Sequence, residues 1–105
     1  MRTAFSGFLI ALAAFLASQS CLAADPQAGK QLAQNTCSAC HGANGIGIAS
    51  IYPNLAGQKG DYLIAQLKAF RDGSRKNPIM SPMAAQLTDA DIENVAAYFS
   101  SLKTP

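Results

Sequence analysis

The chain has one histidine, three cysteines and no tryptophan among its 105 residues, and these scarcities exclude several kinds of site. A structural zinc site takes four protein ligands. Cys37, Cys40 and His41 lie close together, but only the remote Cys21 and no second histidine are left to complete such a site. Charged residues are also few, with eight Lys and Arg against six Asp and Glu. A strongly basic face is therefore absent, and we expect no nucleic-acid partner.

Long hydrophobic runs are lacking as well. The apolar run from Phe8 to Ala17 is ten residues long, whereas a transmembrane helix needs about 20. This run follows Arg2 and precedes small residues that end in Ala23-Ala24, which is typical of a cleaved secretory signal peptide. We therefore expect residues 1–24 to be a signal peptide, residues 25–105 to be the mature domain, and the periplasm to be its location. After cleavage we expect no stable membrane insertion; an uncleaved anchor or lipidation at Cys21 is the alternative.

The most informative residues present are Cys37-Ser38-Ala39-Cys40-His41. Two thiols three positions apart, followed at once by an imidazole, form the attachment sequence for c-type haem. Cys37 and Cys40 can form thioether bonds to the two vinyl groups of one porphyrin, and His41 can supply the proximal axial ligand of the iron. A thioredoxin-like redox pair would need a βαβ context, which the surrounding glycine loops and helix signals do not provide. The motif therefore predicts one covalently attached haem c.

The periodicity of the remaining sequence indicates an all-α domain. Helices are expected over about residues 26–36, 61–72 and 89–102, joined by loops over 42–60 and 73–87. Asp25 and Pro26 suit the start of the first helix, Gly73 suits the end of the second, and Thr88 to Asp91 forms a capping box for the third. A domain this small has difficulty burying enough apolar surface, so the haem would also stabilise the fold.

The sixth position of the iron has several candidate occupants. Without a second histidine, that position falls to methionine, lysine, solvent or nothing. Met80 and Met83 lie in the expected loop between the second and third helices, next to Pro78 and Pro82. A thioether is a soft, neutral ligand that raises the reduction potential of haem iron. Methionine is therefore the strongest candidate, but spacing alone does not choose between Met80 and Met83.

These residues also carry a family resemblance. The stretches concerned are Cys37-Ser38-Ala39-Cys40-His41-Gly42, Tyr52-Pro53-Asn54-Leu55-Ala56-Gly57-Gln58, Asn77-Pro78-Ile79-Met80-Ser81-Pro82-Met83, Leu87-Thr88-Asp89 and Ala96-Ala97-Tyr98-Phe99. Together they resemble the bacterial class I cytochromes c, in particular one domain of the periplasmic diheme group. The resemblance implies the class I fold, with three main helices and loops wrapped around one covalently bound haem. Because only one C-x-x-C-H motif occurs and no internal repeat is visible, a single domain is expected.

The same resemblance implies roles for single residues. Met80 matches the axial methionine, which leaves Met83 to pack against the haem or in the core. Pro53 matches the proline whose carbonyl accepts a hydrogen bond from the proximal histidine, here His41. Gly29 and Tyr98 match the contact where the first and last helices cross, and a side chain at Gly29 would then keep Tyr98 away.

The function expected from these features is that of a single-electron carrier rather than an enzyme. Its partners would be redox proteins: a membrane quinol-oxidising complex, a terminal oxidase or a periplasmic dehydrogenase. We expect a monomer or weak dimer that docks through a small apolar rim formed by Ala39, Ala43, Ile46 and Ile48. Two alternatives stay open, a haem subunit of a larger dehydrogenase complex and a small haem enzyme or gas sensor with a labile sixth ligand. In the last case Arg71 or Arg75 could face the ligand; otherwise they suit propionate or surface contacts.

Overall fold

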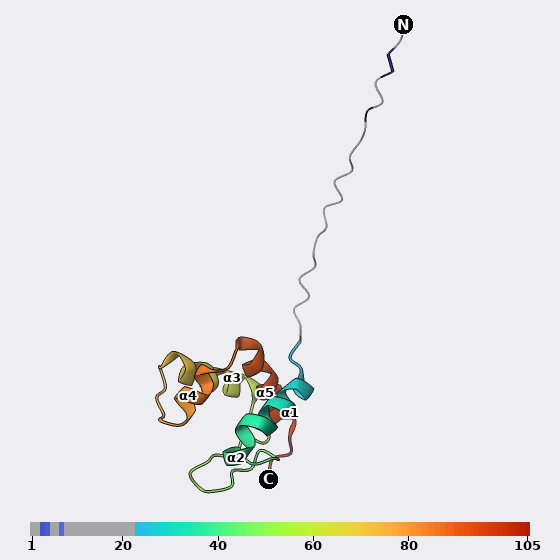
Figure 1. Cartoon of the computed structure of the whole chain (residues 1–105). Helices are drawn as coiled ribbons and strands as arrows, with labels where there is room; N and C mark the ends of the chain where they lie inside the picture. The colour runs from blue at the N-terminus through green and yellow to red at the C-terminus, as the bar shows by residue number, and fades with distance from the viewer. Residues whose placement is uncertain (1–2, 5–6, 8–22) are drawn as a thin grey trace.

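The computed structural model describes residues 3, 4, 7 and 23–105, and every regular element within them is a helix (Figure 1). The expected all-α class is therefore confirmed. Most of the expected signal peptide, including Arg2, Cys21 and the apolar run 8–17, falls outside the described residues and stays a prediction. No helix formed by the described residues has the length and apolarity needed to cross a bilayer. The elements are α1 (Pro26–Leu32), the π-helical turn η1 (Ala33–Cys37), α2 (Ser38–His41), α3 (Gly60–Asp72), α4 (Met80–Ala85) and α5 (Asp89–Ser101).

The first helical segment begins as the sequence predicts but ends later. Asp25 accepts hydrogen bonds from the backbone N–H groups of Gln27 and Ala28 at 3.0 and 3.2 Å, and Pro26 occupies the first turn. The helix does not stop near Thr36, because η1 and α2 continue it through the C-S-A-C-H motif to His41. It ends at Gly42, whose φ of 81° is a conformation that favours glycine.

The π-helical turn η1 is held by both polar groups of Ser38. The backbone N–H of Ser38 donates to the carbonyl of Ala33, five residues back, which bypasses the carbonyl of Gln34. The hydroxyl of Ser38 then donates to that bypassed carbonyl at 2.8 Å. Because the extra residue in the turn slows the rotation of the helix, Gly29, Ala33, Cys37 and His41 can share one face although they are four positions apart.

Residues 42–59 form a loop, as predicted, and its two ends are tied together. The carbonyl of Gly45 accepts from the N–H groups of both Leu55 and Ala56, at 2.7 and 2.9 Å. The side chain of Asn54 accepts from the N–H of Gly47 at 2.8 Å. The exposed stretch 49–51 forms the tip of this loop. The loop is thus a closed structure that returns the chain from α2 to the start of α3.

Helices α3 and α5 lie within one residue of their predicted ends. Gly73 ends α3 in the left-handed conformation, with φ of 87°. Thr88 and Asp91 form the predicted capping box, with bonds of 3.1 Å from Asp91 N–H to the Thr88 hydroxyl and 3.0 Å from Thr88 N–H to the Asp91 carboxylate. Local capping signals therefore located both helices correctly.

Helix α4 was not expected, because residues 73–87 were predicted to be a loop. Asn77 caps this short helix through its side chain and Pro78 follows at a position where a missing N–H costs nothing. The prediction was wrong because Pro78 and Pro82, so close together, indicate a loop. Here Pro78 precedes α4 and Pro82 lies in its first turn, where a missing N–H is tolerated.

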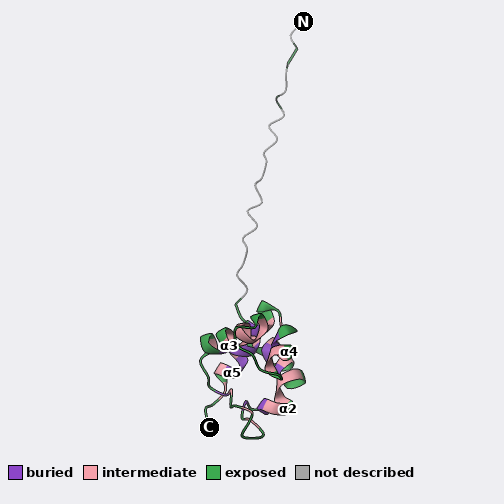
Figure 2. Cartoon of the chain, turned by 90° about the vertical axis from the view of Figure 1, so that its left-hand side faces the viewer, coloured by how far each residue is buried: buried purple, intermediate pink, exposed green. Residues whose placement is uncertain are grey.

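The core is centred on α5, and α1 crosses it closely (Figure 1). The buried residues, purple in Figure 2, include Ala33, Leu63, Val95, Ala96, Tyr98 and Phe99. The crossing at Gly29 is confirmed, but its neighbour was predicted wrongly. A Cβ atom on Gly29 would meet the carbonyl oxygen of Asn94 at 1.9 Å, so the backbone of α5, not the Tyr98 side chain, requires glycine there. Tyr98 instead donates its hydroxyl to the carbonyl of Ala43 at 3.2 Å.

Candidate functional site

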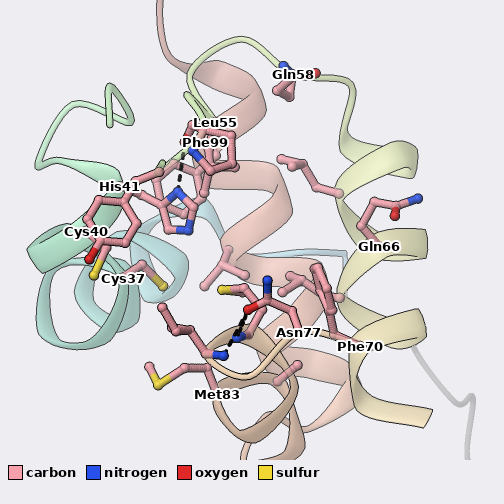
Figure 3. A pocket seen from close by; sticks show the side chains of 18 of the residues that line it. Cys37, Cys40, His41, Leu55, Gln58, Gln66, Phe70, Asn77, Met83 and Phe99 are labelled. Carbon is pink, nitrogen blue, oxygen red and sulfur yellow. Dashed lines mark hydrogen bonds between the residues drawn. The ribbon is translucent and has the colours of Figure 1, made fainter. Parts of the chain in front are cut away.

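A cavity of about 590 Å³ lies between α2, the loop 42–59, α3, α4 and α5. All five residues expected at the site, Cys37, Cys40, His41, Pro53 and Met80, line it, and so does Met83. Figure 3 shows Cys37, Cys40 and His41 on one side of this cavity and Phe70 and Gln66 on the other. The expected site residues, from Cys37 to Met83, therefore surround one space although they are distant in sequence.

His41 is held in a single orientation. It is 7% exposed, and its Nδ1 lies 2.8 Å from the carbonyl oxygen of Pro53 (Figure 3). A carbonyl can only accept, so Nδ1 carries the proton and donates it. In the neutral ring Nε2 then keeps its lone pair and is the nitrogen able to bind a metal. The contact expected between His41 and Pro53 is thus present, and it selects the tautomer that a metal ligand needs.

Cys37 and Cys40 are both free, partly buried thiols on the cavity wall. Burial raises the pKa of the Cys37 thiol to about 11. Hydrogen bonding with Cys40 raises the pKa of the Tyr52 hydroxyl beside it. A redox-active C-x-x-C pair works through a thiol of lowered pKa, whereas here burial keeps Cys37 protonated at neutral pH. This environment argues against thiol–disulfide exchange as the purpose of the pair.

We call residues 26–41 together with Pro53 the histidine side of the cavity, and residues 77–85 the methionine side. On the methionine side, both Met80 and Met83 reach the cavity from α4. The structure therefore brings the two candidates together without excluding either.

Asn77, which the sequence analysis did not single out, lines the same space and accepts a hydrogen bond from the N–H of Met80 at 2.9 Å. An asparagine directly before a proline was the signal for this cap.

The remaining wall is mainly apolar. It includes Leu55, Leu63, Leu67, Phe70, Val95, Ala96 and Phe99. A flat apolar macrocycle fits such a lining, and the two thiols, the imidazole nitrogen and a methionine thioether are groups that could tether it and bind its iron. By contrast, the described residues contain no cluster of three or more His, Cys, Asp or Glu that could hold a bare metal ion. The donor set therefore suits a porphyrin.

Comparison with known protein families matches Cytochrome c over residues 26–103, which is most of the chain. The chain belongs to the cytochrome c family. Its helical fold with one C-x-x-C-H motif is that of a class I c-type cytochrome, and haem c is the cofactor of this family.

Individual relatives agree with this assignment. Cytochrome c-554(548) of Halomonas halodenitrificans is 55% identical over 69 residues, which cover 63% of this chain and 83% of that protein. The thiosulfate dehydrogenase electron acceptor of Stutzerimonas stutzeri is 41% identical over 103 residues, covering 92% of this chain and 48% of that protein. The structure of Acidithiobacillus ferrooxidans cytochrome c4 matches with a TM-score of 0.70 and 39% identity, over 81% of this chain and 54% of that one. This cytochrome c thus spans about half the length of the last two relatives.

The two arginines considered for the site of this cytochrome c have different surroundings. Arg75 lines the cavity, donates to the side chain of Gln66 at 2.6 Å and lies 4.5 Å over the ring of Phe70. Arg71 instead donates to the carbonyl of Leu87 at 3.1 Å and to the carboxylate of Asp89 at 2.5 Å. Only Arg75 is therefore placed to meet a group inside the cavity, while Arg71 joins α3 to the start of α5.

The residues expected to form an apolar docking rim are separate from the margin of the cavity. Ala39, Ala43, Ile46 and Ile48 are exposed, but none of them lines the cavity. The large exposed hydrophobic residues that do line it are Ile51, Tyr62 and Ile79, which are 73%, 52% and 49% exposed. The apolar margin of the cavity is thus formed by the loop tip, α3 and the start of α4.

Proposed function

We propose that this cytochrome c is a periplasmic single-electron carrier and not an enzyme. In this proposal residues 1–24 are a cleaved signal peptide, Cys37 and Cys40 hold one haem c through thioethers, and His41 and Met80 are the axial ligands. When bound, the haem c supplies the one-electron couple. The observation that carries the proposal is the orientation of His41, whose Nδ1 donates to Pro53 and whose Nε2 is left for iron, in a cavity that two methionines also line.

The chain's own residues explain why such a site would exchange electrons rather than transform a substrate. The hydrogen bond from His41 to Pro53 increases the electron donation of the ring and fixes its direction. Apolar side chains from α3 and α5 exclude water, so little rearranges when the charge of the site changes. A thioether opposite His41 would occupy the second axial position and leave no open place for a substrate.

Absorption spectroscopy of the purified holoprotein tests this function. We expect low-spin bands in both oxidation states and a weak far-red iron–sulfur charge-transfer band in the oxidised form. Met80→Ala should abolish the far-red band, and Met83→Ala is the matched control that should keep it. A high-spin spectrum that shifts when carbon monoxide is added to the reduced wild type would contradict the carrier function and favour the ligand-binding alternative. The reverse result for the two variants would assign the ligand to Met83.

The partners of the carrier are redox proteins. A relative is named for accepting electrons from thiosulfate dehydrogenase, and this supports a periplasmic dehydrogenase as the electron donor here. Exposed Ile51, Tyr62 and Ile79 at the margin of the cavity suit a small, quickly released contact of less than about 1,200 Å². Affinity purification from periplasm in low and high salt separates a free carrier from a fixed subunit. A dehydrogenase that co-purifies in stoichiometric amount under both conditions would establish the subunit alternative.

A further inference from the structure

Asn77, which lines the cavity, makes four hydrogen bonds to the residues that follow it. Its side-chain Oδ1 accepts from the N–H groups of Ile79 and Met80, both at 2.9 Å. Its own N–H donates to the hydroxyl of Ser81 at 3.0 Å, and its carbonyl accepts from the N–H of Ser81 at 3.0 Å. Asn77 therefore fixes the backbone on both sides of Met80.

This arrangement matters because α4 cannot maintain itself. The helix has six residues, and isolated helices shorter than about 12 residues are marginal in water. Its first turn leaves several N–H groups without helical partners, and Asn77 satisfies two of them. Besides packing against α3, the start of α4 is thus held by the Asn77 side chain, which binds the N–H of Met80.

The two methionines differ in how firmly their backbones are held. Met80 N–H is bound by Asn77 at 2.9 Å, whereas Met83 N–H reaches the carbonyl of Ile79 only at 3.4 Å. Both side chains are partly buried at the same cavity. The side chain of Asn77 therefore acts directly on one methionine and not on the other.

We propose that Asn77 is a positioning residue that holds Met80, rather than Met83, at the place facing His41. The inference rests on the proposed function, in which a methionine is an axial ligand. Asn77 touches neither the iron nor the redox partner in this role; it limits how often the Met80 segment swings away. Loss of the cap should let an external ligand compete more easily for that position.

Titration of the ferric holoprotein with imidazole tests this role. Asn77→Ala removes the acceptor, and we expect imidazole to bind about fivefold more tightly, the order expected for loss of one hydrogen bond. Asn77→Asp keeps an acceptor at the same place and should return the affinity to within about twofold of the wild type. Ser81→Ala weakens the same cap and should give an intermediate affinity, which keeps the test available if Asn77→Ala does not accumulate.

A purely structural role would give a different result. Ser101→Ala removes a hydroxyl that donates to the backbone carbonyl of Tyr98 on α5 at 2.6 Å, away from α4. It should change the unfolding temperature without changing the imidazole affinity. Wild-type affinity in Asn77→Ala, or equal tightening in Asn77→Asp or Ser101→Ala, would overturn the inference. Absence of the far-red band from the wild type itself would instead refute methionine ligation, so the two failures are distinguishable.

Discussion

The two sides of the cavity are built in different ways. The histidine side depends on contacts between residues that are distant in sequence: Gly29 against the backbone of Asn94, and His41 against Pro53. The methionine side depends on hydrogen bonds among close neighbours, from Asn77 to Ser81, and on packing of the short α4 against α3. A side held by many distant contacts moves only if the core moves, whereas a side held locally can open alone.

The difference assigns separate tasks to the two sides. The histidine side carries both cysteines, so it must keep three groups in one fixed geometry. The methionine side supplies one proposed ligand, whose strength of attachment can be adjusted without disturbing α5. We therefore expect substitutions on the histidine side to affect stability most and substitutions on the methionine side to affect ligand exchange most.

The largest loss of stability is expected from Gly29→Ala. A Cβ atom would come within 1.9 Å of the Asn94 carbonyl, so α1 and α5 must separate. Overpacking of this kind costs roughly 2 kcal/mol or more, which outweighs the gain in helix propensity. Gly60→Ala is the control, because its new Cβ would lie at an ordinary 3.6 Å from Ser100. Urea unfolding of both holoproteins measures the difference, and equal stabilities would show that distant packing does not govern the histidine side.

A smaller effect is expected from Ser38→Ala. The change leaves the carbonyl of Gln34 without its hydroxyl donor, which costs about 1 kcal/mol. Distant contacts at Gly29 and His41 should still hold the helix, so both thioethers should form. The pyridine haemochrome spectrum reports any vinyl group left unreacted. Ser100→Ala is the matched control, because it removes a hydroxyl that donates to a carbonyl within an ordinary α-helical turn. Loss of one thioether in Ser38→Ala would mean that the histidine side also relies on a hydrogen bond between close neighbours in sequence.

The smallest effect, and one that depends on pH, is expected from Asp89→Asn. Hydrogen bonding from Arg71, reinforced by its charge, lowers the pKa of Asp89 in the folded protein. A lowered folded pKa means that the pair stabilises the fold above the ordinary carboxyl pKa and loses this contribution as the pH falls through the folded value. Wild type and Asp89→Asn should therefore differ in unfolding temperature at neutral pH and converge in acid.

Salt and a neighbouring carboxyl provide the controls for that experiment. Because both partners are partly exposed, added salt should reduce the difference. Glu93→Gln changes another exposed carboxyl on α5 that takes no part in this ion pair. A gap between wild type and Asp89→Asn that persists in acid would contradict the role given to Arg71.

Local signals explain which parts of the structure were predictable from sequence. Thr88 and Asp91, Gly73 and Asp25 each act on their own turn, so their effects can be recognised without knowing the fold. The contact from His41 to Pro53 was anticipated from the family resemblance and is present at 2.8 Å.

The features that were missed depend on tertiary context or on competing signals. The π-helical turn lies between the part of the helix that packs on α5 and the part that lines the cavity, and no residue type marks it. Helix α4 was obscured because Pro78 and Pro82 favour a loop in isolation. The neighbour of Gly29 could not be found either, since periodicity predicts that helices cross but not which atoms meet.

The closed loop 42–59 has a consequence for how this protein can diversify. Gly45 and Asn54 secure the base of the loop, so Pro53 stays in place for His41 whatever residues occupy the tip at 49–51. The tip is exposed and includes Ile51 at the margin of the cavity. In the proposed carrier, exchange of the tip residues would therefore change the surface offered to a partner protein while the imidazole of His41 keeps its orientation.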